Sequence, residues 1–283
     1  MKKKTLFLAV AIIFTWTLAL VGCSQNPSTS STTSTKQTTV IAVTGGNPAP
    51  FTYTGDDGQL TGQNIELLQA IFDRLPQYNL ELQQTEFSSM FSGLTSERYQ
   101  IGVNNLAKNA EREKNYLFSD PIFKNSYVAI FKKGNDLFEN VSSWSDLAGL
   151  STVGATGINT TTAIESYNAA HPDATITFNY TAEDLVAQLR SIESGKYDFL
   201  LMDKPMFEYY QKEYDFALEA KDVSGDLADE LLGSPYSYLI FAKGQEELVE
   251  DVNAALRDVI EDGTSKKINE KYFGTDYSPS YKD

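Results

Sequence analysis

Short apolar segments alternate with amphipathic segments along most of this chain, and this alternation limits its fold more than any other feature. In the clearest amphipathic segment, 246–262, apolar residues recur at helical spacing and Gly263 follows as a stop signal. The clearest apolar segment, 197–202, lies between Gly195 and Asp203. Strands that alternate with helices in this way predict an α/β fold with mostly parallel sheets.

The same periodicities divide the rest of the chain into elements. The expected strands are 40–44, 80–85, 101–103, 127–132, 152–155, 175–180, 197–202 and 236–241. The expected helices are 64–75, 88–98, 143–147, 160–170, 181–194, 246–262 and 265–272. Asn64 is expected to cap the first of these helices, and Thr181 with Asp184 resembles a capping box.

The first 22 residues have the pattern of a secretory signal peptide, in which three lysines precede an apolar run. The run is too short, and the segment after it too polar, for a membrane-spanning helix. It ends at Leu20-Val21-Gly22-Cys23, which resembles the lipobox of bacterial lipoproteins. We therefore expect 1–22 to be removed and Cys23 to be acylated; an incidental thiol is the alternative.

The segment that follows Cys23 consists mostly of Ser and Thr as far as residue 39. Such a segment buries too little apolar surface to offset the entropy lost on folding, so we expect 23–39 to be a lipidated tether. The folded body is expected to begin near Val40. A lipid, a tether and a body predict a protein held on the outer face of a cell membrane. The long tether and the lack of a disulfide favour a Gram-positive surface.

Composition excludes several kinds of function. The formal net charge of −15 is unfavourable for a nucleic-acid partner. A chain with one His and one Cys cannot build a His/Cys metal cluster, and any Ser-His-Asp or Cys-His mechanism would have to use His171. His171 stands at an expected helix end before Pro172, where capping is its simplest role. We expect no catalytic residue, no metal and no cofactor.

Several short stretches together resemble the polar amino-acid substrate-binding proteins of ABC importers, solute-binding protein family 3. They are Gly-Gln-Asn-Ile-Glu-Leu at 62–67, Glu-Arg and Phe-Ser-Asp-Pro within 111–121, Asp-Leu-Ala-Gly at 146–149, Gly-Lys-Tyr-Asp at 195–198, and the C-terminal stretch 262–274. The resemblance covers 40–277. Two stretches, 86–94 and 111–120, look most like the cystine-binding branch of this family.

The resemblance implies the type II periplasmic-binding-protein-like fold, in which two α/β lobes are joined by two hinge crossings and hold the ligand in the cleft between them. One lobe would comprise 40–125 and 233–283, and the other 126–232. The hinges would fall near 124–127 and 232–236. Closure of the lobes on a ligand would change the surface that meets the ABC permease subunits in the membrane. We expect the protein to be a monomer.

A free amino acid presents a carboxylate and an ammonium, so its receptor needs a cation and an acid. The resemblance places Arg112 at the carboxylate, where its planar fork can make two parallel bonds. An exposed Arg at a helix start, between Glu111 and Glu113, is the alternative. The resemblance places Asp203 at the ammonium, and Asp203 follows an apolar strand at the end where α/β proteins bind ligands. A helix cap for 204–211 is its alternative.

Three further residues match ligand-binding positions of the family on the side of Arg112. Asn105 and Ala107 match positions that offer backbone or side-chain groups, and at Ala107 only the N–H can serve. Phe87 matches a position whose ring packs on the ligand, where an ammonium would be attracted to the ring face. A core Phe beside Met90 is the alternative for Phe87.

Asn159, Thr160 and Thr161 open an expected helix, and helix N-termini present free N–H groups to anions. The resemblance implies that these three residues reach the ligand carboxylate from the second lobe. A Thr-rich helix cap without a ligand is the alternative. The family commonly has Gly where this chain has Ile158, and an aromatic residue where it has Pro48.

These observations predict a lipid-anchored, non-enzymatic receptor that captures an amino acid and delivers it to an ABC permease. Cystine is the favoured ligand, and other polar amino acids come next. Two other functions use the same fold. One is a cyclohexadienyl or arogenate dehydratase, and the other is the ligand-sensing subunit of a signalling system.

Overall fold

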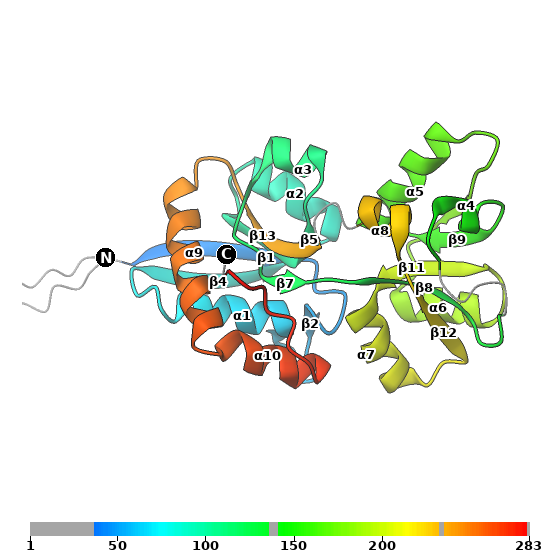
Figure 1. Ribbon diagram of the computed structural model, residues 1–283. Helices are drawn as coiled ribbons and strands as arrows, with labels where there is room; N and C mark the ends of the chain where they lie inside the picture. Colours follow the sequence, from blue (N-terminus) through cyan, green and yellow to red (C-terminus); the bar gives the residue numbers. More distant parts are fainter. Residues whose placement is uncertain (1–36, 136–140, 232–234, 282–283) are drawn as a thin grey trace, which may run out of the picture. The chain divides into compact units, whose positions relative to one another are not determined.

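The computed structural model describes residues 37–135, 141–231 and 235–281 (Figure 1). The expected signal peptide 1–22, Cys23 and most of the expected tether lie outside these residues. In the part of the chain that is described, no helix is both long and apolar enough to cross a membrane.

The first sheet has six strands, which come from both ends of the chain. They are β1 (Thr38–Thr44), β4 (Tyr78–Gln84), β5 (Ile101–Ala107), β6 (Leu117–Phe118), β7 (Phe123–Lys124) and β13 (Tyr236–Phe241). β1 pairs in parallel with β4 and β5, and β13 runs antiparallel to β5, β6 and β7. β1 begins at Thr38, two residues before the expected start of the folded body.

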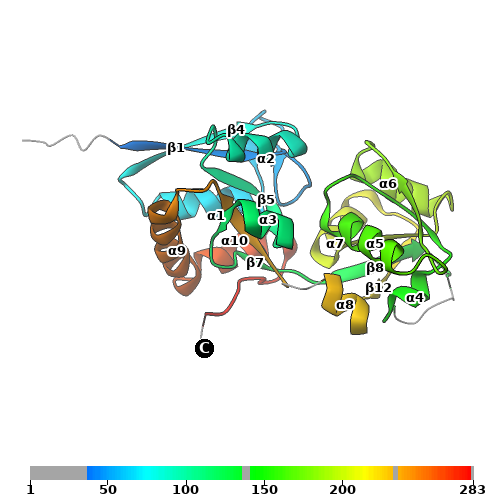
Figure 2. The same cartoon turned by 90° about the horizontal axis from the view of Figure 1, so that it is seen from above.

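Five helices and one small hairpin accompany this sheet. They are α1 (Gln63–Phe72), α2 (Phe87–Thr95), α3 (Ala110–Asn115), α9 (Glu246–Glu261) and α10 (Thr264–Phe273), with the hairpin of β2 (Tyr53–Thr54) and β3 (Leu60–Thr61). α1, α9 and α10 pack against one another, so the C-terminal helices cover the first helix of the body (Figures 1 and 2).

The second sheet is built entirely from the middle of the chain. Its strands are β8 (Tyr127–Lys132), β9 (Ser151–Gly154), β10 (Thr177–Tyr180), β11 (Phe199–Asp203) and β12 (Leu218–Asp222). The helices among them are α4 (Trp144–Leu147), α5 (Asn159–Ala170), α6 (Leu185–Glu193), α7 (Lys204–Tyr214) and α8 (Gly225–Leu231). β9 is parallel to β10 and β11, whereas β8 is antiparallel to β11 and β12.

Both sheets are mixed, whereas the sequence predicted mostly parallel sheets. Each has three parallel strands, β4-β1-β5 and β10-β9-β11, extended by antiparallel strands. The physical reason lies in the connections. Parallel neighbours need a crossover segment such as a helix, but β8 follows β7 directly and enters its sheet in the opposite direction to β11.

The chain leaves the first sheet and enters the second between β7 and β8, within the segment 124–127 where the first hinge was expected (Figure 2). Between these strands, the N–H of Asn125 donates to Pro235 O at 2.8 Å, and Ser126 O accepts the N–H of Lys204 at 2.8 Å. The first bond ties this crossing to the return path into β13. Residues 232–234 of that return path lie outside the described residues.

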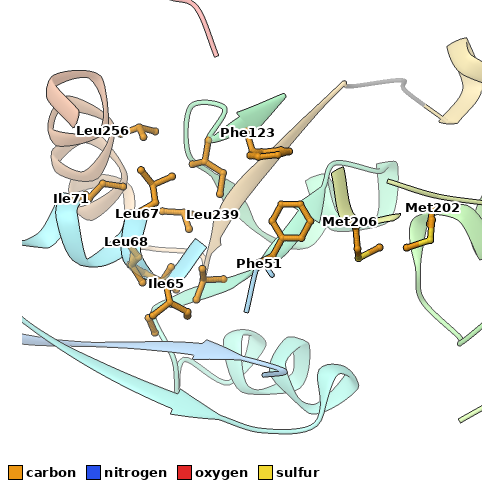
Figure 3. Packing of buried hydrophobic residues seen from close by; sticks show 14 of the residues in the cluster. Phe51, Ile65, Leu67, Leu68, Ile71, Phe123, Met202, Met206, Leu239 and Leu256 are labelled. Atoms are coloured by element: carbon orange, nitrogen blue, oxygen red, sulfur yellow. The ribbon is translucent and has the colours of Figure 1, made fainter. Parts of the chain in front are cut away.

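The apolar face of α1 fills the core of the first lobe. Ile65, Leu68 and Ile71 are fully buried, and Leu256 of α9 and Leu239 of β13 belong to the same cluster (Figure 3). Full burial of such a side chain contributes ~1.5–3 kcal/mol. A separate cluster within the second lobe contains Tyr127, Phe131, Trp144, Leu147, Phe199 and Leu201.

Leu68→Ala is expected to lower the free energy of unfolding by ~2–5 kcal/mol, because it leaves a cavity in this core. Urea unfolding followed by circular dichroism measures the loss. Gln69→Ala on the exposed side of α1 is the control, with an expected change within ~0.5 kcal/mol. Equal losses for the two variants would contradict the full burial of Leu68 in this core.

The sequence predicted that Asn64 caps α1, and this prediction is wrong. The helix begins at Gln63, and the residue before it is Gly62, with φ 120°. A Cβ at Gly62 would collide with Phe51 O, so only Gly fits there. Asn64 instead lies inside the helix, fully buried, where its Oδ1 accepts the N–H of Asn105 at 2.6 Å.

The start of α6 also differs in detail from the expected capping box. Asp184 is itself the N-cap, and its side chain accepts the N–H of Ala187 at 2.8 Å. The Thr181 hydroxyl accepts the N–H of Glu183 in a local turn. An Asp placed next to an amphipathic segment satisfies the free N–H groups without a partner upstream.

Candidate functional site

Arg112 is buried in the first turns of α3, with 7% of its surface exposed, which rules out an exposed Arg at a helix start. The Asn109 side chain caps α3 by accepting the N–H of Arg112 at 2.8 Å. The guanidinium donates to Ala107 O at 2.8 Å and to Gly157 O at 3.2 Å. It also lies over the Phe91 ring, 5.2 Å from the centroid. Carbonyls from both lobes therefore hold this guanidinium.

No carboxylate pairs with Arg112 among the described residues, whose ion pairs all involve other side chains. Burial lowers the pKa of Arg112, because removal of water disfavours the charged form. A buried cation without a counter-charge is costly, and an anion beside it would offset that cost. The site around Arg112 is thus suited to an anionic ligand group.

Asp203 is the last residue of β11, and its side chain has the opposite charge to Arg112. Its Oδ1 is buried and has no hydrogen-bond partner in the described part of the chain. Burial raises the pKa of Asp203 to about 7, against the opposing effects of hydrogen bonds from its own backbone and from the Asn105 side chain. Asp203 occupies the N-cap position of α7, but its side chain makes no capping bond. The carboxylate is therefore available to a cation.

Tyr127 is a site residue that the sequence reasoning missed. It is 7% exposed and opens β8, directly opposite Asp203 in the antiparallel ladder. Burial and the charge of Asp203 raise its pKa, while a hydrogen bond with Asn159 and the charge of Arg112 lower it. Tyr127 therefore lies among Arg112, Asp203 and Asn159. Only the antiparallel pairing of β8 with β11 could have revealed this.

Asn105 is brought next to Asp203 by an unusual backbone conformation. Its φ is 50°, in the left-handed region that Asn tolerates better than most residues. Its Oδ1 accepts the hydroxyl of Ser237 at 2.6 Å, and its side chain acts to lower the pKa of Asp203 by favouring the charged carboxylate. The buried Ser237 hydroxyl was not identified from the sequence.

The N-terminus of α5 supplies the remaining groups from the second lobe. Its N-cap residue, Ile158, has no side-chain capping bond. The Asn159 side chain donates to Leu231 O at 3.4 Å and acts to lower the pKa of Tyr127, and Thr160 is half-buried beside it. The Thr161 hydroxyl donates to Ala155 O at 2.9 Å, so it belongs to the turn that follows β9.

Phe87 opens α2 and is half-buried, and it packs at the margin of a core cluster. Its ring meets the Phe91 ring edge to face, with centroids 5.2 Å apart. Because Phe91 in turn lies under Arg112, Phe87 is one ring away from the guanidinium. The structure thus brings Phe87 to the edge of the cluster.

A cavity of about 350 Å³ adjoins these residues and shares Asn159 with them. Its lining carries charges of both signs, from Lys108, Glu113 and Glu230. The Lys108 ammonium lies 4.4 Å from the centroid of the Tyr238 ring. Within the described residues, no group of three or more His, Cys, Asp or Glu side chains is arranged to hold a metal ion.

Residues 40–275 match the family of bacterial extracellular solute-binding proteins, family 3, and the chain belongs to this family. This confirms the resemblance seen in the sequence, and with it the two-lobed type II α/β fold.

Similar proteins include two from Bacillus subtilis. The L-cystine-binding protein TcyJ is 29% identical over 279 residues, which are 99% of this chain and 98% of that protein. The L-cystine-binding protein TcyA is 32% identical over 87% of this chain and 85% of its own length. A solved structure from work on glutathione import via GshT and the cystine ABC importer TcyBC of Streptococcus mutans is 36% identical. It has a TM-score of 0.78 and covers 87% of this chain and 99% of that one.

Proposed function

We propose that this protein binds a free amino acid between Arg112 and Asp203 and delivers it to the permease of an ABC importer. One observation carries the proposal. A buried guanidinium and a half-buried carboxylate whose Oδ1 is buried, each without an oppositely charged partner among the described residues, both interact with the Tyr127 side chain. An α-amino acid carries the two complementary charges on adjacent carbons.

The energetics suit reversible capture. Each hydrogen bond to a charged group contributes ~1.5–3 kcal/mol, and micromolar affinity needs about 8 kcal/mol. Two bonds from the Arg112 fork and two at the Asp203 carboxylate reach that range. The uncapped N–H groups at the start of α5 add to the carboxylate side. The ligand relieves two unpaired charges at once, which favours the conformation that buries it.

Cystine is the ligand that we favour. Relatives along nearly the whole chain are named for L-cystine, and a similar structure concerns glutathione import and a cystine importer. Cystine and glutathione both combine an amino-acid head with a second charged end. A neighbouring cavity lined by Lys108, Glu113 and Glu230 is suited to such an end. Glutathione is therefore the second candidate, ahead of smaller polar amino acids.

The N-terminal sequence supports the cellular location that we propose. Removal of residues 1–22 and acylation of Cys23 would anchor a monomeric receptor at the outer face of the membrane, as on a Gram-positive surface. The tether would then hold the body close to its permease, which raises their effective concentration. Radiolabelled palmitate incorporation that is lost in Cys23→Ala tests the anchor.

L-cystine is expected to raise the melting temperature of the chain produced without residues 1–22. A ligand at 100 times its dissociation constant stabilises the native state by ~2.7 kcal/mol. Thermal-shift measurement followed by calorimetry checks this, with glutathione, L-glutamine and arogenate alongside and D-cystine as the control. Stabilisation by glutathione alone would show that the ligand is glutathione and not cystine. Turnover of arogenate would show that the protein is an enzyme and not a receptor. No stabilisation by any amino acid would contradict the proposed function.

A further inference from the structure

Asn105 lies at a distorted point in the middle of β5. Its φ of 50° is unusual in a strand, and the pairing of β5 with β13 shifts register between Tyr238 and Ile240. Backbone strain of this kind persists only where surrounding contacts hold the residue in place. For Asn105, those contacts are hydrogen bonds to buried polar side chains.

Two short hydrogen bonds fix the orientation of Asn105. Its backbone N–H donates to Asn64 Oδ1 at 2.6 Å, and its own Oδ1 accepts the Ser237 hydroxyl at 2.6 Å. Because a hydroxyl has one proton, its donation to Oδ1 decides which end of the amide faces each neighbour. The Asn105 amide nitrogen is then the end left to face other neighbours, and the Asn105 side chain acts to lower the pKa of Asp203.

Ser237 is in turn linked to the segment that crosses between the sheets. It is fully buried, and its hydroxyl oxygen accepts the Asn125 side chain at 3.4 Å. Asn125 is 5% exposed, lies between β7 and β8, and donates its N–H to Pro235 O. Its Oδ1 is buried without a partner in the described part of the chain. Hydrogen bonds therefore join both crossing segments to Asn105, and the Asn105 side chain favours the charged form of Asp203.

We propose that Ser237 and Asn125 are positioning residues, which act through Asn105 to hold a hydrogen-bond donor against Asp203 and aim its carboxylate at the ligand's ammonium. This inference rests on the function proposed above and extends it. Binding at Asp203 is thereby coupled to the two segments that connect the lobes, because the same hydrogen bonds reach both of them.

The other charged or titratable groups around Asp203 are on different elements. Tyr127 of β8 lies opposite Asp203, and Arg112 of α3 acts on Tyr127. Lys204, next in the chain, pairs with Asp222 at 2.9 Å. A substitution at Ser237 leaves these four side chains in place. A change in the titration of Asp203 on such a substitution therefore reports on the Asn105 donor.

Ser237→Ala in the otherwise unchanged protein tests the proposal with two measurements. In ¹³C NMR of the ligand-free protein, the titration midpoint of the Asp203 carboxyl is expected to rise by about one pH unit, since a donor that favours the carboxylate is lost. Calorimetry at pH 7 is expected to show about tenfold weaker L-cystine binding, as the loss of one hydrogen bond to a charged group predicts.

Ser119→Ala is the matched control. Ser119 is 4% exposed, and its hydroxyl accepts the N–H of Leu239 at 3.0 Å and donates to Asp120 O at 2.6 Å. This variant also loses a buried hydroxyl that is hydrogen-bonded to β13, but this hydroxyl makes no hydrogen bond to Asn105, Ser237 or Asn125. Its Asp203 titration and its L-cystine affinity are expected to match the wild type.

Identical Asp203 titrations in the Ser237→Ala and Ser119→Ala proteins would overturn the proposal. A wild-type protein that fails to bind L-cystine would contradict the proposed ligand instead, and the NMR titration would still decide the positioning role. If Ser237→Ala does not fold, Asn105→Gly gives the same test, because Gly accepts a φ of 50° and removes the donor. The same rise in midpoint is expected, and an unchanged midpoint overturns the proposal.

Discussion

Arg112→Met is expected to weaken amino-acid binding at least ~100-fold while leaving the ligand-free protein no less stable than the wild type. Two hydrogen bonds from the fork to a ligand carboxylate contribute at least ~3 kcal/mol together, which sets the loss of affinity. Stability holds because the variant removes a buried charge that has no carboxylate partner in the described residues. Met fills much of the same volume beside Phe91.

Calorimetry and thermal unfolding of the ligand-free protein measure the two effects separately. Arg257→Met is the matched control, because Arg257 is exposed and pairs with Asp120. It is expected to change neither affinity nor stability by more than ~0.5–1 kcal/mol. Arg112→Lys keeps the charge but loses the fork, and an intermediate affinity is expected. Full binding by Arg112→Met would show that the ligand carboxylate lies elsewhere.

Opposite effects on binding and stability would express a general property of such receptors. A side chain that binds a charged ligand is poorly satisfied while it waits for that ligand, so it costs the free protein stability. Within the described residues, the Arg112 guanidinium donates only to the Ala107 and Gly157 carbonyls, and Asp203 has one oxygen without a partner. Ligand binding then offsets the free-energy cost of folding with these two charged groups unpaired.

The sequence predicted the apolar parts of this fold well. The strands 127–132 and 236–241 have the predicted bounds; α9 ends one residue earlier than predicted, and α10 is one residue longer at each end. These elements have strong period-2 or period-3.6 patterns, which burial on one face imposes. The short strands β6, β7 and β12 were missed, because two-residue or charged segments carry no such pattern.

The candidate site was predicted only in part, for a related reason. Arg112, Asn105 and Asp203 were named from local motifs, and the structure brings them into one cluster. Tyr127 and Ser237 belong to that cluster through strand pairing, which joins residues far apart in the chain. Antiparallel pairing of β8 with β11 cannot be inferred from either strand alone, since the apolar pattern is the same in both directions.

Asp203→Asn is expected to weaken amino-acid binding at pH 8 at least tenfold and to remove its dependence on pH between 5 and 8. In the ligand-free protein, burial raises the pKa of Asp203 to about 7 from 3.8. The contribution of this carboxyl to the stability of the folded protein is therefore fully present below about pH 4, and it is lost as the pH rises through about 7. A ligand ammonium favours the carboxylate, so binding below pH 7 must release a proton.

Wild-type affinity should therefore fall as the pH drops below about 7, by up to tenfold per unit, while the Asn variant stays level. Calorimetry at pH 5, 6, 7 and 8 gives both curves. Asp222→Asn is the control, because Asp222 is exposed and pairs with Lys204 next to the same helix. Its curve is expected to follow that of the wild type. A wild-type affinity that is constant from pH 5 to 8 would mean that Asp203 exchanges no proton on binding, which contradicts a carboxyl with a pKa of about 7 that pairs with the ligand ammonium.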